Sequence, residues 1–300
     1  MIALNFDKLR NFRKMVLISL FSNDDLLEIF VVKGGSAIDL VYKIDSRASI
    51  DIDVSMENDF NEYELKDIQR KLHVAIEQTF EENGYTIFDF KLIEKPKNLS
   101  ADLALFWGGY QVEFKIQPLS NKSLIEKDLD AARKTSEVVG HHEAKKFTID
   151  ISKFEYCKDK VIADIDGYTI YVYTPKMLIF EKLRAICQQM AEYPINGGRT
   201  KKPRPSDFYD IYVLTNHFNI DFTDEDLDVI TAIFHIKQAD LGLLKLIPRY
   251  KNFFVEGLDT LKSTLTSDKL ASFNFDTYFN FVIKLTDAII TKHNKKLTAI

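Results

Sequence analysis

Residues 49–56 alternate strictly between polar and apolar side chains, and this pattern limits the possible folds more than any other in the chain. Such alternation predicts a β-strand with one buried face and one polar face. Two carboxylates, Asp51 and Asp53, lie on the polar face. Because alternate residues of a strand project in the same direction, we expect these two carboxylates to point the same way.

A strand, a turn and a helix are predicted just before this segment. The apolar run Ile29–Val32 predicts a short buried strand, and the adjacent Gly34 and Gly35 permit a sharp turn with positive φ. Ser36, followed three residues later by Asp39, is typical of a helix N-terminus. The order is therefore strand, glycine turn, helix and acidic strand.

This order supplies the residue types that nucleotidyl transfer requires. Two parallel carboxylates can hold one or two Mg²⁺ or Mn²⁺ ions, which neutralise a triphosphate and polarise an attacking hydroxyl. The free N–H groups of a helix N-terminus, together with the Ser36 hydroxyl, suit the β and γ phosphates of an NTP. Lys33 and Arg47 flank the segment and add positive charge.

Several of these residues also have purely structural interpretations. Asp51 and Asp53 could line a solvated strand face, Ser36 could serve only as a helix cap, and the glycines could form only a turn. Glu113 is the natural candidate for a third metal-binding carboxylate, but its strand pattern fits an exposed sheet edge equally well. The loop residues 141–143, two histidines and a glutamate, could bind metal, although such neighbours are more often simply exposed.

The spacing of apolar residues predicts two domains. Over residues 1–173 it predicts helices at 6–21 and 62–82, together with strands at 85–92, 99–106, 110–117, 147–151 and 160–173. Asp166–Gly167 predicts a hairpin turn within the last of these segments. Thr174–Pro175 is a favourable helix start, and helical spacing dominates from there to residue 300. The predicted fold is mixed α/β (α+β), a mixed sheet with flanking helices, followed by a C-terminal helical bundle over 174–300.

Composition narrows the choice of partners and compartment. The net charge of −5 lacks the basic excess of an obligate nucleic-acid coat protein. Residues 199–204 nevertheless place four cations in six positions, which predicts a local phosphate-contacting patch or, equally, a solvated loop. Cys157 and Cys187 have no neighbours at metal-ligand spacing. Because the apolar runs are also too short to span a bilayer, we expect a cytoplasmic protein without membrane contact.

Four segments together resemble the signature of the AbiEii/AbiGii toxin family of nucleotidyltransferases, which belongs to the DNA polymerase beta superfamily. They are, in order along the chain, Lys33–Ala37, Arg47–Asp53, Glu181–Ala185 and Asp207–Leu214. The resemblance implies a nucleotidyltransferase-like sheet and an active site in a cleft completed by the helical domain. It assigns metal binding to Asp51 and Asp53, triphosphate binding to Ser36 and Arg47, a lining role to Ser49, and completion of the site to Lys182 and Asp207.

One position in the last motif is open. Pro205 and Ser206 precede Asp207, where family members often have an arginine before the first aspartate. Asp210 lies three residues further along the same helical face, so either carboxylate could reach the site. A first-turn carboxylate that interacts with the helix dipole is the alternative for Asp207, and a solvated lysine is the alternative for Lys182.

The resemblance also implies a biological role. The expected protein is a toxin of a bacterial type IV toxin–antitoxin or abortive-infection (phage-defence) system, which uses an NTP and Mg²⁺ to modify an RNA acceptor, the 3′ end of tRNA in some relatives. A separately encoded antitoxin that represses transcription is its expected partner. Two alternatives remain: transfer to a small molecule or protein, and a non-catalytic NTP-binding module that acts through a partner. The intact carboxylate pair argues against the module.

Overall fold

The computed structural model describes residues 5–44, 46–49, 51–195 and 200–298. The chain divides into two compact units, Met1–Val172 and Tyr173–Ile300. The division expected from the sequence lies one residue later, between 173 and 174. Within the described residues, no helix is long and apolar enough to cross a membrane.

A mixed sheet, as predicted, forms the centre of the first unit, and within the described residues it has seven strands. Its strands are β1 (Val31–Lys33), β2 (Ile52–Ser55), β3 (Tyr85–Lys95), β4 (Gly109–Pro118), β5 (Phe147–Ser152), β6 (Val161–Ile165) and β7 (Tyr168–Val172). Their spatial order is β3-β4-β5-β2-β1-β7-β6. The β1–β7 and β2–β5 pairs are parallel and the others are antiparallel. The acidic strand β2 therefore lies inside the sheet, between β5 and β1.

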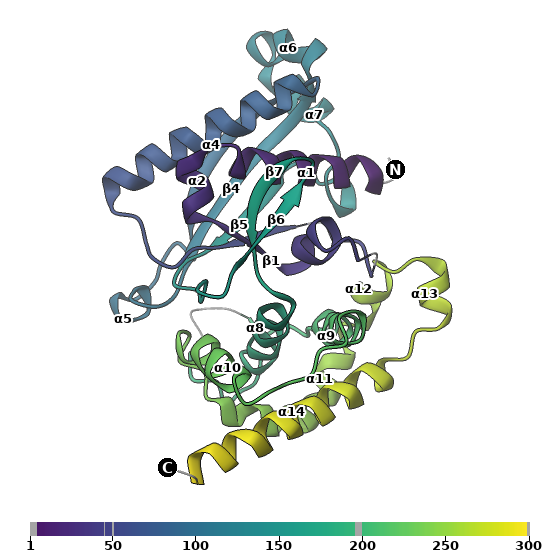
Figure 1. Cartoon of the computed structure of the whole chain (residues 1–300). Coiled ribbons are helices and arrows are strands. Elements are labelled where there is room, and N and C mark those ends of the chain that lie inside the picture. The colour runs from purple at the N-terminus through teal and green to yellow at the C-terminus, as the bar shows by residue number, and fades with distance from the viewer. Residues whose placement is uncertain (1–4, 45, 50, 196–199, 299–300) are drawn as a thin grey trace. The chain divides into compact units, whose positions relative to one another are not determined.

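Two long helices, α1 (Phe6–Phe21) and α4 (Glu62–Glu82), pack side by side in this unit (Figure 1). Phe12 of α1 stacks on Phe80 of α4 with ring centroids 5.9 Å apart. Asn61 and Glu64 form a capping box that starts α4 where the sequence predicts a helix. Most periodic apolar residues of both helices are buried, which explains why the pattern identified them, whereas Phe6 at the start of α1 is 43% exposed.

Shorter helices connect these elements. They are α2 (Asp24–Ile29), α3 (Gly34–Ser36), the π-helix η1 (Ala37–Val41), α5 (Ala101–Ala104), η2 (Leu119–Asn121), α6 (Lys122–Lys127), α7 (Leu129–Thr135) and η3 (His141–Glu143). The predicted strand at 99–106 is wrong, because α5 occupies this segment. Ala, Leu and Ala within α5 are good helix formers, and Ser100 is extended just before them, as residues before a helix commonly are.

The predicted hairpin turn is confirmed, since Asp166 and Gly167 both have positive φ, 51° and 87°. The acidic strand is shorter than its alternation suggested. Pairing begins at Ile52, so Asp53 lies within β2 and Asp51 lies just before it.

The second unit is helical, as predicted. Its elements are α8 (Pro175–Cys187), α9 (Pro205–His217), α10 (Asp226–His235), η4 (Leu241–Tyr250), α11 (Lys251–Val255), α12 (Leu258–Lys262), α13 (Ser267–Ala271) and α14 (Phe275–Thr298). Helix α9 packs on α8 and on the long C-terminal helix α14 (Figure 1). Its Phe208 contacts the rings of Phe254, Phe275 and Phe279, with centroids 4.9, 5.6 and 5.3 Å away. This aromatic cluster is the centre of the helical core.

Candidate active site

The two glycines of the turn after β1 lie directly against the acidic strand. Gly34 has φ +64°, and a Cβ there would lie 2.4 Å from Oδ2 of Asp53. A Cβ at Gly35 would lie 2.4 Å from Oγ of Ser49 and 3.9 Å from Nη2 of Arg47. Any side chain at either position would collide, so the glycines allow the backbone to approach these residues. The structure thus brings together five of the residues singled out in the sequence.

Ser36 is held differently from what its motif position suggests. Its side chain is fully buried, and its hydroxyl donates to the backbone carbonyl of Asp51 at 2.9 Å. The same oxygen accepts a hydrogen bond from Nη2 of Arg13 at 3.0 Å. The hydroxyl proton is already donated within the protein. Ser36 could therefore donate a hydrogen bond to a phosphate only through its backbone N–H.

A row of polar residues crosses the sheet at Asp53. Asp53 is paired with Lys33 on β1 and with Asp150 on β5, and Asp150 is paired in turn with Gln111 on β4. Nε2 of Gln111 donates to Oδ1 of Asp150 at 2.8 Å. Directly paired residues of neighbouring strands project from the same face, so Asp150 is a third carboxylate next to the predicted pair.

Asp150 was not identified as a site residue from the sequence, although the alternation of polar and apolar residues around it indicates a polar strand face. Residues 147–151 alternate in the same way as 49–56, with Phe147, Ile149 and Ile151 buried. The local pattern could identify a polar strand face, but not that β5 pairs with β2, about one hundred residues earlier in the chain.

The structure places the predicted third carboxylate, Glu113, further away. It lies on β4, which β5 separates from β2, and its Oε1 binds Nζ of Lys146 at 2.9 Å. The sheet order, which the sequence could not supply, makes Asp150 the neighbour of Asp53 instead.

Lys33 and Glu155 form a buried pair at the end of β1. The Nζ of Lys33 lies 3.6 Å from Oε1 of Glu155, and both side chains are almost inaccessible to solvent. The Lys33 charge is therefore partly balanced within the protein, which leaves less of it for a phosphate.

The pKa of Asp51 is raised above its usual value. The main cause is the surrounding protein, which reduces hydration of the carboxylate, and the second is the nearby carboxylate of Asp150. Arg13 and Arg47 oppose the shift without cancelling it. Asp51 remains exposed to solvent, so water screens part of this effect.

The predicted residues of the helical unit form a buried cluster between α8 and α9. Nζ of Lys182 lies 2.7 Å from Oδ2 of Asp210 and 3.2 Å from Oδ1 of Asp207, and Arg204 also binds Asp207. Burial alone would raise the pKa of Asp207, but the charges of Arg204 and Lys182 outweigh it and hold that pKa below its usual value. One lysine therefore contacts both candidate carboxylates.

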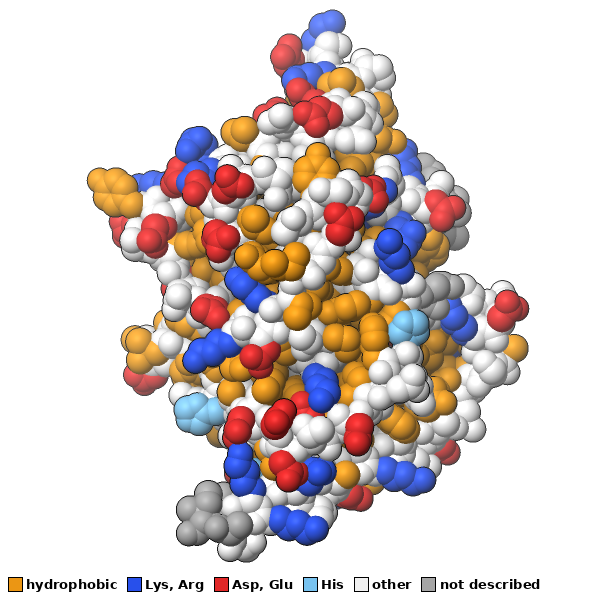
Figure 2. Space-filling model, in the orientation of Figure 1, with side chains coloured by type: hydrophobic (Ala, Val, Ile, Leu, Met, Phe, Trp, Pro, Cys, Tyr) orange, Lys and Arg blue, Asp and Glu red, His pale blue; other side chains and the backbone are white. Residues whose placement is uncertain are grey.

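The cationic loop is only partly available to a phosphate. Lys201 donates to the carbonyl of Gln188 at 2.9 Å, and burial lowers its pKa. Arg204 binds Asp207, whereas the side chain of Lys202 is exposed. Arg199 lies outside the described residues. On the face shown in Figure 2, positive and negative side chains are interspersed rather than gathered by sign.

The side chains near β2 could bind a divalent metal ion with only one or two protein ligands. Within the part of the chain that the structure describes, no group of three or more His, Cys, Asp or Glu could hold a metal ion. This includes the exposed segment His141–Glu143. Mg²⁺, however, is usually bound by one or two carboxylates plus substrate phosphates, and retains several waters. Asp51 and Asp53 suit that mode, because Asp51 is exposed to solvent and Asp53 lies beside Asp150 in the sheet.

Comparison with protein families gives a match over residues 16–271. The matching family is described as nucleotidyl transferase AbiEii toxin of the type IV toxin–antitoxin systems. The match covers most of the chain, including every residue proposed above for the site. A search of curated proteins found no match.

One solved structure shares the fold over the whole chain. JHP933 from Helicobacter pylori is similar over 100% of this chain and 97% of its own, with a TM-score of 0.53 and 15% identity. A putative nucleotidyltransferase from H. pylori gives 0.49 and 16%, with 98% of each chain covered. MenT4, a nucleotidyltransferase toxin from Mycobacterium tuberculosis, gives 0.42 and 11%, over 80% of this chain and 64% of its own.

Proposed function

The chain belongs to the AbiEii family of nucleotidyltransferase toxins of type IV toxin–antitoxin systems, and we propose that it transfers a nucleotide from an NTP to RNA with the help of a divalent metal ion. The observation that carries the proposal is the acidic row of the sheet. Asp53 lies between Lys33 and Asp150 in that row, with the glycine turn against its carboxylate. The glycine turn brings the backbone close to this carboxylate, which suits a site where phosphate groups and a metal ion meet.

In the proposed reaction, Asp51 and Asp53 hold Mg²⁺ or Mn²⁺. A divalent ion held there would supply charge that offsets the triphosphate and would polarise the acceptor hydroxyl, so that the hydroxyl oxygen could bond to the α-phosphorus as pyrophosphate leaves. The glycine turn brings the backbone of Gly34 and Gly35 against Asp53 and Ser49, and in the proposal its N–H groups bind phosphate oxygens. Arg47, whose guanidinium lies close to Gly35, supplies positive charge there.

The helical unit contributes Lys182 and Asp207 in this proposal. The lysine ammonium is fixed by two carboxylates, so its position is set before substrate arrives. It would offset charge that develops on the phosphoryl oxygens. Asp210 shares the same lysine, and we propose that the two aspartates act as one unit that orients it.

RNA, and specifically the 3′ end of tRNA, is the proposed acceptor. Its support is the resemblance to tRNA-modifying relatives and the cationic segment 199–204, of which Lys202 is exposed. We place the reaction in the cytoplasm, where NTPs and tRNA occur, with a separately encoded antitoxin as the neutralising partner. The alternative acceptors, a small molecule or a protein hydroxyl, would leave RNA unlabelled.

The test is incubation of the purified protein with Mg²⁺, each α-labelled NTP in turn and total bacterial tRNA, followed by a denaturing gel. We expect label in tRNA with one or more NTPs, and none with Asp51→Ala. Asp130→Ala is a matched control, because Asp130 also belongs to an Asp-x-Asp sequence but lies exposed on α7 and binds Arg133. Release of pyrophosphate without label in tRNA would point to another acceptor, and binding of NTP without its consumption would point to a non-catalytic module.

A further inference from the structure

One arginine of α1 reaches into the base of the candidate site. Arg13 is 1% exposed, and its Nη1 lies 2.7 Å from Oδ2 of Asp39 on η1. Its Nη2 donates to Oγ of Ser36 at 3.0 Å. Arg10, one turn earlier, binds the other oxygen of Asp39 at 3.1 Å but is itself exposed. Only Arg13 therefore joins Asp39 to Ser36.

The direction of these hydrogen bonds is fixed by chemistry. A guanidinium has donors and no acceptor, so Ser36 must accept from Arg13. Its single hydroxyl proton is then available for the carbonyl of Asp51, which lies 2.9 Å away. Arg13 thus orients the hydroxyl that holds the backbone of the first candidate metal ligand.

This contact matters because Asp51 lies outside the sheet ladder. Residues 52–55 are held by pairing with β5, and three of them also pair with β1. The pairing ends at Ile52, and the bond from Ser36 holds the carbonyl one residue earlier. Free movement of that backbone would move the Asp51 carboxylate relative to Asp53.

We propose that Arg13 is a positioning residue for Asp51, acting through Ser36 to hold the two candidate metal-binding carboxylates in a fixed relation. The inference rests on the proposed function for its consequence, metal binding, but the position of Asp51 can be measured separately. Residues that orient metal ligands typically change metal affinity or activity by about 10- to 100-fold when removed.

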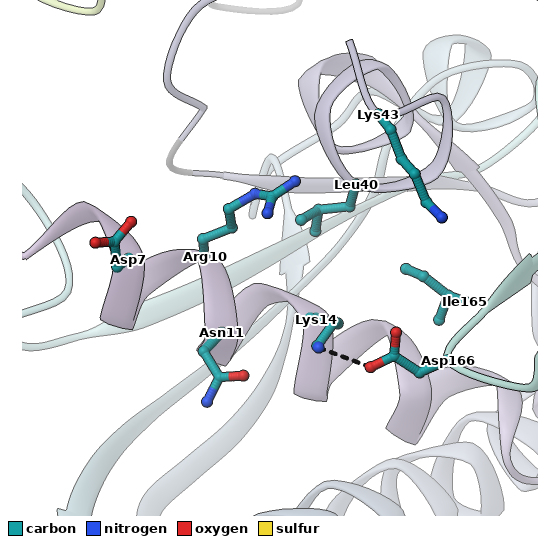
Figure 3. A pocket seen from close by; sticks show the side chains of 8 residues that line it. All are labelled: Asp7, Arg10, Asn11, Lys14, Leu40, Lys43, Ile165 and Asp166. Atoms are coloured by element: carbon teal, nitrogen blue, oxygen red, sulfur yellow. Dashed lines mark ion pairs between the residues drawn. The ribbon is translucent and has the colours of Figure 1, made fainter. Parts of the chain in front are cut away.

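Arg10 provides a matched control on the same helix. Its side chain lines an open cavity of about 420 Å³ with Lys14, Lys43 and Asp166 (Figure 3). It shares Asp39 with Arg13 but, among the described residues, makes no hydrogen bond to Ser36. Arg10→Gln therefore removes a charge from Asp39 and preserves the Arg13–Ser36–Asp51 contacts.

The experiment compares wild type, Arg13→Lys, Arg13→Met and Arg10→Gln in two measurements. Mn²⁺ titration followed by electron paramagnetic resonance gives the metal affinity. Hydrogen–deuterium exchange of a peptide covering residues 47–56, with one from 85–95 as internal reference, reports the backbone around Asp51 without metal. Circular dichroism and thermal melting establish that each variant is folded.

We expect both Arg13 variants to bind Mn²⁺ roughly tenfold or more weakly and to exchange faster in 47–56 than in the reference peptide. Lysine keeps the charge but lacks the planar fork that joins Asp39 and Ser36, so it should not restore binding. Arg10→Gln should stay within about twofold of wild type, because no ligand-orienting contact is lost.

A folded Arg13→Lys protein with wild-type exchange in 47–56 and wild-type Mn²⁺ affinity would overturn the inference. This variant also carries the test if Arg13→Met fails to fold, since it keeps a cation opposite Asp39. Failure of the proposed function looks different: wild type itself would bind no Mn²⁺ and transfer no nucleotide. In that case the exchange measurement alone decides whether Arg13 positions Asp51.

Discussion

Two groups of charged residues, one in each unit, solve the same electrostatic problem in opposite ways. Around Lys182, two buried carboxylates share the buried lysine, the exposed Arg204 also binds Asp207, and the pKa of Asp207 is lowered. Around Asp53, burial and then the neighbouring carboxylate of Asp150 raise the pKa of Asp51. In the helical cluster the cations outweigh burial at Asp207, whereas at Asp51 burial and the charge of Asp150 outweigh the nearby cations.

This difference predicts that the helical cluster matters mainly for stability and the sheet cluster mainly for activity. A balanced buried cluster is stable without a ligand, and its loss is felt mainly as unfolding. A solvent-accessible carboxylate with a raised pKa lowers the free energy of unfolding while it is ionised. A bound cation recovers this loss. The predictions below therefore expect activity effects without unfolding in the sheet and stability effects in the helical unit.

The largest effect is expected at the carboxylate pair. Asp51→Ala or Asp53→Ala should lower nucleotidyl transfer by about 10³-fold or more, because the metal ion loses a direct ligand. The thermal unfolding of either variant should remain close to that of wild type. Single-turnover assays with labelled NTP measure the first quantity and calorimetry the second. Undiminished transfer in both variants would remove the metal assignment.

A stability effect of about 3–5 kcal/mol is expected for Lys182→Met, which leaves two buried carboxylates without their shared lysine. Urea denaturation measures the free energy of unfolding. Lys296→Met is the control, because Lys296 pairs with Asp228 where both side chains are exposed, and it should cost under about 1 kcal/mol. An equal loss of unfolding free energy in the two variants would mean that the buried ion pairs of Lys182 are no more important for stability than the exposed pair of Lys296.

A smaller effect on activity is expected for the carboxylate next to Asp53. Asp150→Asn should reduce transfer or Mn²⁺ affinity by about 10- to 100-fold, since it removes negative charge beside the metal ligands. Glu113→Gln should change either quantity by less than about twofold, because Glu113 already binds Lys146 two strands away from β2. A larger loss of transfer or Mn²⁺ affinity for Glu113→Gln than for Asp150→Asn would support Glu113 as the third metal-binding carboxylate instead.

The smallest effect concerns the charge of Asp51. Its pKa is raised in the folded protein, so the ionised form costs stability at pH 7, and this cost disappears as the pH falls below the raised pKa. Without divalent metal, Asp51→Asn should raise the free energy of unfolding at pH 7 by less than about 1 kcal/mol, since solvent screens an exposed carboxylate. Added Mg²⁺ should stabilise wild type only. A lower free energy of unfolding for the variant than for wild type at pH 7 would contradict the raised pKa of Asp51.

The sequence predicted those features that local patterns encode. The helix at 62–82 has both ends where they were expected, because a capping box and a 3.6-residue period define it. The mixed sheet followed by a helical bundle was likewise visible in the change of periodicity after residue 173. The segment at 99–106 misled the prediction, because its apolar residues also suit a short helix.

The site was only partly predictable, for a reason of distance along the chain. Gly34, Gly35, Ser49 and Asp53 lie close together in sequence and in space. Asp150 enters through strand pairing from about one hundred residues away. Arg13, from the first helix, determines how Ser36 is used, and nothing in the spacing of a helical arginine indicates such a contact.

The order of strands in the sheet also has a consequence for synthesis on the ribosome. The acidic strand β2 is flanked by β1, made just before it, and by β5, which begins only at Phe147. The other neighbour of β1 is β7, which ends at Val172. A nascent chain that stops short of residue 147 leaves both edges of the β1–β2 pair open and lacks Asp150. Premature termination would therefore release an inactive, aggregation-prone fragment instead of an active enzyme.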